Sequence, residues 1–414
     1  MVFLRFGIVT AGVHFSIRRL HFGQRKSPAM RTLATAALFC FCALSARLCH
    51  AQYGIYFDCH RPDPVAPPHL DHPHVDGALL RWPWAMVEPE RGRYDFSAIE
   101  RDIAPWVKAG KKVLIGVVLA GQHNQETPPW LYDEIPPIEF IRTGKNYEVR
   151  APNYWDARFL RAVSGMVRAL GQPYDSDPRI EAVMIGVGHL GFLTAAPNAG
   201  GAEAFLKAGW TPEKWKNYSE AMIHLYREAF PSKPLFIRGE GLVVRAPAPA
   251  KVGFPGSKPM FTDLRDEILF TAATQYGIGV GCNGLAGDAE RFLATGIPQL
   301  YERLGPGALA GKYRLEIADD WPIWVNEKRR KESQVDRKSD NDYFKRCLEN
   351  AGGAAPGLPR LHIGWMKMLE TDLDCTNPNH PDYQKDCEEK LIWLKSQLAP
   401  PPKPVQAKPA ASGR

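Results

Sequence analysis

The chain has 414 residues, and its 52 Lys and Arg residues against 45 Asp and Glu residues give a formal net charge of +7. Seven of the basic residues and no acidic residue lie in residues 1–51, so the rest of the chain is neutral. The apparent basicity therefore provides no argument for nucleic acid or an anionic membrane as a partner.

Residues 30–52 have the layout of a secretory signal. Arg31 provides a positive charge, an apolar run follows it, and Ala51 is a small residue at a suitable cleavage point. The apolar run is too short to span a bilayer. We expect residues 1–51 to be a cleavable leader, with Met30 as an alternative start. The mature protein is then expected to be secreted or periplasmic, without a membrane-spanning segment.

Short apolar runs alternate with longer amphipathic segments through the rest of the chain, which is typical of βα units. The apolar runs predict strands at residues 53–58, 77–84, 112–120, 180–188, 234–241, 276–284, 313–321 and 361–369. Helical segments are predicted at residues 96–109, 155–170, 211–230, 288–304 and 340–351. After the first strand, the Pro- and His-rich segment 59–76 replaces a helix.

This alternation predicts an α/β protein with one (β/α)8 TIM barrel over residues 52–399, with long loops after the strands. A doubly wound open sheet is the alternative, but no Gly-rich nucleotide motif follows the first strand. The Pro-, Ala- and Lys-rich residues 400–414 are expected to be a disordered tail.

Carboxylates cluster at the predicted strand ends, where a barrel carries its active site. They are Asp58, Glu240, Glu316, Asp319 and Asp320. Glycoside hydrolysis requires two carboxyl groups, one as proton donor and the other as nucleophile or base. Glu316 is the first candidate and Glu240 the second. A buried ion pair of Glu316 with Arg238 or Arg81 is the structural alternative.

Residues 81–118 resemble the second and third βα units of family 42 beta-galactosidases and related retaining glycoside hydrolases. The pattern of aromatic residues, Glu-Pro-x-x-Gly, Asp-Phe and Gly-Lys is matched by Trp84, Glu88, Pro89, Gly92, Tyr94, Asp95, Phe96, Gly110 and Lys111. The segment Thr-Pro-Pro-Trp-Leu at residues 127–131 and Trp365 in the eighth strand extend the likeness. The resemblance implies a general acid Glu at the end of strand four and a nucleophile Glu at the end of strand seven, which is Glu316.

The predicted fourth strand departs from this pattern. Some relatives end it with Gly-x-x-Gly-Glu, and the same register in residues 186–192 has Phe192 in place of Glu. A phenyl ring cannot exchange a proton, so His189 or Glu240 becomes the candidate donor. The hypotheses are a glycoside hydrolase or, because of this departure, a carbohydrate-binding barrel that does not hydrolyse.

Further residues are expected to contact a carbohydrate substrate, with the tryptophans as sugar platforms. They are Asp58, Arg81, Trp84, Trp130, Asn283, Asp319 and Trp365. No cofactor and no metal site is predicted, because the spacing of His60, His69, His72 and His74 matches no metal motif. A lyase or a metal-dependent hydrolase using these histidines is the remaining alternative.

Five cysteines follow the leader, namely Cys59, Cys282, Cys347, Cys375 and Cys387. Export permits disulfides. Cys375 and Cys387 flank a short polar loop and are the best predicted pair.

Overall fold

The computed structural model describes residues 54–59, 65–121, 124–141, 147–195, 201–239, 262–282, 300, 303, 313–316, 345–346, 349–350, 363–368, 373–381 and 383–398. The chain divides into two units, Met1–His50 and Ala51–Arg414, and every described residue belongs to the second. The predicted leader and the predicted tail lie outside the described residues and stay predictions.

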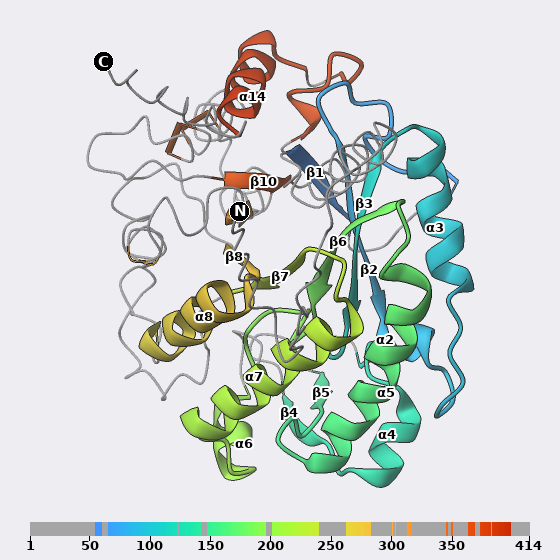
Figure 1. Cartoon of the computed structure of the whole chain (residues 1–414), viewed down its shortest axis with the longest axis vertical. Coiled ribbons are helices and arrows are strands. Elements are labelled where there is room, and N and C mark those ends of the chain that lie inside the picture. The colour runs from blue at the N-terminus through green and yellow to red at the C-terminus, as the bar shows by residue number, and fades with distance from the viewer. Residues whose placement is uncertain are drawn as a thin grey trace, which may run out of the picture. The chain divides into compact units, whose positions relative to one another are not determined.

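Within this described part, eight parallel strands close into a barrel in the order β1-β10-β9-β8-β7-β6-β3-β2 (Figure 1). The strands are β1 (Gly54–Cys59), β2 (Gly77–Pro83), β3 (Lys112–Val118), β6 (Ile180–Ile185), β7 (Leu235–Arg238), β8 (Gly279–Cys282), β9 (Tyr313–Glu316) and β10 (Ile363–Met368). Each strand overlaps one predicted strand, so the predicted TIM barrel is confirmed. The open sheet is excluded, because β1 pairs with both β2 and β10.

Helices follow the strands along the chain, and the last helix comes after the final strand. They are α2 (Trp84–Val87), α3 (Ser97–Lys108), α4 (Pro129–Glu134), α5 (Ala157–Tyr174), α6 (Ala202–Lys207), α7 (Pro212–Ala229), α8 (Thr262–Tyr276) and α14 (Lys385–Gln397). The predicted start of α7 is confirmed, because Thr211 Oγ1 accepts a hydrogen bond from Lys214 N at 3.1 Å and Pro212 follows directly. Of the helices in the described residues, none has the length and apolarity to cross a membrane.

The long segment after β3 has structure of its own that the sequence pattern did not predict. It contains α4 and an antiparallel hairpin of β4 (Ile138–Ile141) and β5 (Glu148–Ala151). Asn124 fastens the segment to the hairpin, donating to Glu148 O at 2.9 Å and accepting from Arg150 N at 2.7 Å. The hairpin alternates buried and exposed residues over only four positions per strand, which is too short for a clear period-two signal.

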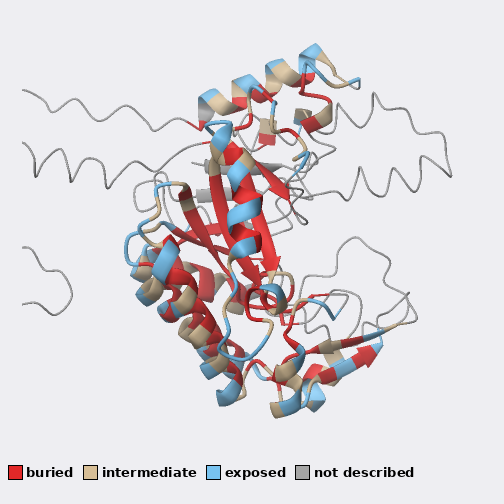
Figure 2. Cartoon of the chain, turned by 90° about the vertical axis from the view of Figure 1, so that its right-hand side faces the viewer, coloured by how far each residue is buried: buried red, intermediate tan, exposed pale blue. Residues whose placement is uncertain are grey.

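Side chains fill the inside of the barrel. Its inner cluster consists of Tyr56, Leu79, Leu114, Ala182, Met184 and Phe236. Gly116 makes room for Met184, because a Cβ on this glycine would lie 2.7 Å from Met184 Cε. The intervening strand residues face outward against the helices, whose far sides are exposed (Figure 2). The packed interior confines any substrate site to the ends of the strands.

The Pro- and His-rich segment before β2 is fastened to the C-terminal helix α14 and to the loop that precedes it. His72 Nε2 lies 3.0 Å from Thr376 Oγ1, and His74 Nε2 lies 2.7 Å from Glu388 Oε1. Lys395 Nζ adds an ion pair to Asp76 Oδ1 at 2.7 Å. These contacts take the place of the helix that the first βα unit lacks. In the part of the chain that the structure describes, which excludes His60, no group of three or more His, Cys, Asp or Glu residues could hold a metal ion.

The predicted disulfide partners Cys375 and Cys387 lie in the loop before α14 and in the first turn of α14. Cys375 and Cys387 are both buried. Gln384 N donates to Cys375 O at 2.8 Å, and Cys387 N donates to Gln384 O at 3.1 Å. The disulfide itself stays a prediction.

We expect His72 to make the protein less stable in acid. Burial lowers the pKa of His72 from 6.5 to about 3, and electrostatic repulsion from His69, His74 and Lys111 adds to this effect. Below pH 6.5, His72 therefore takes up a proton in the unfolded chain but not in the folded chain. The free energy of unfolding then falls as the pH is lowered. At pH 5 the loss should be roughly 1 to 2 kcal/mol, the lower figure allowing for solvent screening.

Urea unfolding at pH 7.5 and pH 5.0 measures this effect. His72→Gln should flatten the pH dependence between these values, because its amide can still reach Thr376 but does not titrate. His224→Gln is the matched control, since His224 is exposed on α7. An equal loss of stability in wild type and His72→Gln would contradict the assignment.

Candidate active site

The mouth of the barrel is defined here as the end at which the C-terminal ends of the eight described barrel strands meet. Because all neighbouring strands are parallel, residues from distant parts of the chain converge there. The described side chains of the mouth come from the ends of β1, β2 and β7 and from the turn that follows β6.

A buried ion pair joins the first two strands at the mouth. Arg81 Nη2 donates to both carboxylate oxygens of Asp58 at 2.9 Å. The Arg81 side chain is 2% exposed and the Asp58 side chain is fully buried. Arg81 Nη1 also donates to Leu190 O at 3.4 Å, in the turn after β6. Arg81 therefore links three elements, and the two residues expected to bind substrate hold each other.

The fourth barrel strand ends earlier than predicted, and residues 188–194 form a tight turn. Gly188 N donates to Phe192 O at 2.9 Å, and His189 N donates to Thr194 O at 2.9 Å. Leu190 has the left-handed φ of 54°, which is uncommon for a residue with a side chain. A Cβ on Gly188 would lie 2.1 Å from Thr194 O, so the turn requires glycine at its start.

Both neighbouring strands hold this turn in place. Leu190 N donates to Ala120 O, just beyond β3, at 2.7 Å. Leu193 N donates to Arg238 O, at the end of β7, at 2.7 Å. Residues 188–194 therefore close the gap between β3 and β7 at the mouth, and they form a rigid part of it.

Phe192 packs against a buried guanidinium. Arg238 Cζ lies 3.7 Å from the centroid of the Phe192 ring, a close cation–π contact. Phe192 is 6% exposed and Arg238 is 1% exposed. At the position where the resemblance expects a protonated Glu, the structure thus has a phenyl ring on a cation. A carboxylate here would be held ionised by Arg238, which is the opposite of what a proton donor needs.

The three predicted catalytic residues are described to different extents. His189 is buried at the start of the turn and pairs with Ala120 in an isolated bridge. Glu316 ends β9, the seventh barrel strand, as expected, and its backbone is in register with Lys367 of β10. Glu240 lies outside the described residues, as do the expected substrate-binding residues Asn283 and Asp319.

Trp84 and Trp130 lie in a structural anchor built around Glu88. Trp84 Nε1 donates to Glu88 Oε2 at 2.8 Å, and Trp130 Nε1 donates to Glu88 O at 3.1 Å. Gly92 N donates to Glu88 Oε1 at 2.8 Å. Burial raises the pKa of Glu88, and the hydrogen bonds from Gly92 and Trp84 oppose that rise. Trp84 is fully buried, so its ring offers no surface to a sugar, whereas Trp130 is half-buried.

Trp365 lies farther from the mouth than a sugar platform at the mouth would lie. Its backbone pairs with Gly54, the first residue of β1, whereas Asp58 lies near the end of that strand.

The contact of Arg238 with Phe192 was not predicted from the sequence, in which Arg238 is only a possible ion-pair partner of Glu316. One signal could have placed Arg238 inside the barrel. It follows the inward-facing Phe236 by two residues, which is the period of a strand.

The comparisons with known proteins agree with this geometry. The sequence pattern of glycoside hydrolase family 42, described as beta-galactosidase, matches residues 78–188. This match confirms the predicted resemblance of the second and third βα units, extends to the fourth barrel strand, and supports a glycoside hydrolase. No curated protein shows significant sequence similarity to the chain.

The solved structure of one glycosidase domain shares the fold, and two further glycosidases show a weaker likeness. The catalytic domain of beta-amylase from Paenibacillus polymyxa is 10% identical, with 79% of this chain and 92% of that chain covered and a TM-score of 0.52. Xylanase 10B from Thermotoga maritima is 10% identical, with 84% and 96% covered and a TM-score of 0.46. Beta-galactosidase from the psychrophilic Marinomonas ef1 is 12% identical, with 83% and 59% covered and a TM-score of 0.41. At 10% identity the likeness to the beta-amylase domain is one of fold alone.

Proposed function

We propose that this chain, whose residues 78–188 match the family 42 beta-galactosidases, is an exported glycoside hydrolase that cleaves O-glycosidic bonds of a glycan. The observation that carries the proposal is that the matched residues form three strands of a closed (β/α)8 barrel. Glu316 is the last residue of β9, the seventh strand of the barrel, where the family resemblance expects a nucleophile.

In the proposed reaction Glu316 attacks the anomeric carbon, or activates water, while a second group protonates the leaving oxygen. Two guanidinium groups, of Arg81 and Arg238, are buried at the mouth. The charge of Arg81 is balanced by Asp58, whereas the positive charge of Arg238 favours the ionised form of any carboxylate close to it, as a nucleophile requires. The proton donor must keep its proton, and Glu240 and His189 are the candidates for it.

The test is turnover by the purified mature protein on aryl glycosides and on neutral plant and bacterial polysaccharides. Release of aryl alcohol or of reducing ends is the expected result. Retained binding of a sugar without any turnover would contradict the proposal and favour a second candidate function.

That second candidate is a carbohydrate-binding barrel that does not hydrolyse. The contact of Phe192 with Arg238 favours it, because it removes the acid from the strand-four position that the resemblance implies. The two functions differ in one measurement, namely whether bound glycan is converted to shorter products.

Export is part of the proposal and has its own test. The signal-like layout of residues 30–52 supports cleavage near Ala51. N-terminal sequencing of protein recovered from the periplasm or the medium should then begin at or near Gln52. Protein that stays inside the cell with an intact leader would contradict export.

A further inference from the structure

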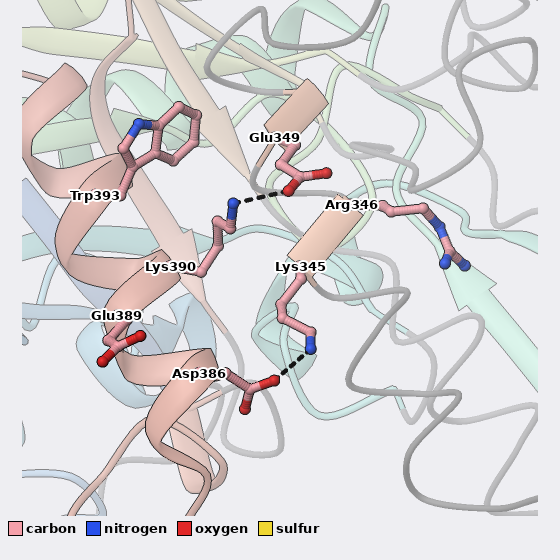
Figure 3. Close-up of a pocket in the computed structure, with 7 residues that line it drawn as sticks. All are labelled: Lys345, Arg346, Glu349, Asp386, Glu389, Lys390 and Trp393. Carbon is pink, nitrogen blue, oxygen red and sulfur yellow. Dashed lines mark hydrogen bonds and ion pairs between the residues drawn. The ribbon is translucent and has the colours of Figure 1, made fainter.

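A pocket of about 560 Å³ lies beside the C-terminal helix, outside the candidate active site (Figure 3). One wall is α14, and the other is formed by the helical residues 345–346 and 349–350. The lining residues are Lys345, Arg346, Glu349, Asp386, Glu389, Lys390 and Trp393. This volume is in the range of cavities that bind small ligands.

The pocket is remote from the mouth. Lys395, in the last turn of α14, pairs with Asp76, which directly precedes β2 and accepts a hydrogen bond from Ile55 N at the start of β1. The helix is therefore fastened at the N-terminal ends of the strands, away from α2 and α4, which follow their C-terminal ends (Figure 1). A ligand in this pocket would leave the mouth accessible.

Two ion pairs cross between the walls and set their separation. Lys390 Nζ lies 2.7 Å from Glu349 Oε1, and Lys345 pairs with Asp386 (Figure 3). Because both pairs are partly exposed, their value lies in positioning the walls, and their contribution to stability is small. They also hold four charged groups in fixed places from which to hydrogen-bond a ligand.

The chemistry of the lining suits a neutral sugar. Trp393 is half-buried and borders the pocket, with Lys390 Nζ at 5.1 Å from its ring centroid. An indole combines a large apolar face with a polar edge, so it can stack on the apolar face of a pyranose ring. Three basic and three acidic side chains surround it, so the lining is electrically balanced and does not select a polyanion.

We propose that this pocket is a second glycan-binding site, which takes a neutral oligosaccharide segment with Trp393 as its platform. The inference rests on the proposed function, in that the bound segment belongs to the same kind of polymer that is cleaved at the mouth. Holding the polymer at two places raises its effective concentration at the mouth without changing the chemistry there.

The test compares binding of polymers with turnover of small substrates. Affinity electrophoresis in gels containing β-1,4-galactan, arabinoxylan or soluble starch measures the first, and aryl glycosides, which reach only the mouth, measure the second. Trp393→Ala should lower affinity for the retarding polymer at least about tenfold, as expected when one stacking platform is lost. Its kcat/KM on aryl glycosides should stay within about twofold.

Ile392→Ala is the matched control, because Ile392 is an exposed apolar residue adjacent in α14 that does not line the pocket. Glu389→Ala is a second test variant. The Glu389 carboxylate is exposed and takes no part in the ion pairs between the walls. Its removal should therefore weaken binding and leave the helix folded, even if Trp393→Ala unfolds the helix. Circular dichroism reports whether each variant is folded.

Three results would overturn the inference. They are unchanged polymer affinity in folded Trp393→Ala and Glu389→Ala, equal loss of affinity in Ile392→Ala, and retardation of wild type by polygalacturonate alone. The result also separates this inference from the proposed hydrolysis. Polymer binding that depends on Trp393 without turnover supports the site and refutes hydrolysis, whereas turnover without such binding refutes the site alone.

Discussion

Replacing Glu316 with Gln should lower kcat on aryl glycosides by about 10³-fold or more, with little change in KM. An amide is isosteric with the carboxylate, so the sugar can still bind. It cannot attack the anomeric carbon or take a proton from water, and the chemical step therefore loses its nucleophile or base. Steady-state kinetics on the best aryl glycoside found for wild type give both constants.

Glu228→Gln is the control for this measurement, because Glu228 is an exposed residue of α7 and its substitution should leave kcat unchanged. A second variant, Glu316→Ala, distinguishes a nucleophile from a structural group. Added azide should restore part of its turnover, since a small anion can attack from the vacated space. Glu316→Gln with more than a tenth of wild-type kcat would show that the nucleophile is another residue.

The proton donor can then be assigned by pH. In a plot of kcat/KM against pH, the rising and falling limbs report the essential base and acid of the free enzyme. Glu240→Gln and His189→Gln should each be compared with wild type, and the limb that disappears identifies the donor. Loss of activity without any change of profile in both variants would exclude both residues.

Removing Asp58 should destabilise the protein by about 3 to 5 kcal/mol, which is a large part of the stability of a typical domain. Asp58→Ala takes the bidentate carboxylate away from Arg81, whose side chain is only 2% exposed. A guanidinium that loses its carboxylate in the interior keeps the full cost of desolvation. Urea unfolding monitored by circular dichroism at pH 7.5 measures the change in free energy of unfolding.

A double-mutant cycle separates the contribution of the Asp58–Arg81 ion pair to stability from the effect of lost packing. Asp58→Ala combined with Arg81→Leu should recover part of the lost stability, because no buried charge then remains. Glu228→Ala provides the contrast, since its 3.9 Å pair with Arg168 is exposed and should be worth less than about 0.5 kcal/mol. A cost below about 1 kcal/mol for Asp58→Ala, with a raised KM, would instead assign this residue to substrate, as the sequence analysis expects.

The location of all eight barrel strands follows from local sequence. Runs such as residues 113–118 are apolar throughout, because a parallel strand in a barrel is buried on both faces. The start of α7 is equally local, since a Thr cap followed by Pro acts within one turn of helix. The family resemblance of residues 81–118 includes a local anchor as well, because the Glu88 carboxylate accepts hydrogen bonds from Trp84 and Gly92, each four positions away.

The arrangement at the mouth does not follow from local sequence. Asp58 and Arg81 are each polar residues at a strand end, and only the pairing of β1 with β2 makes them partners. Phe192 meets Arg238 because the turn after β6 bends back onto the end of β7. The sequence register identified Phe192 as the departure from the family pattern, but it contained no information on what the ring would contact.

The sequence by itself determined the class of the protein, through the period of its apolar residues and the residues 78–188 that match a beta-galactosidase family. Only the tertiary structure decided what the polar residues do. The histidines of the segment before β2 illustrate the reason, because their partners Thr376 and Glu388 lie 304 and 314 residues away along the chain. Hydrophobic periodicity is read within one element, whereas a buried polar side chain is defined by partners that barrel closure brings to it.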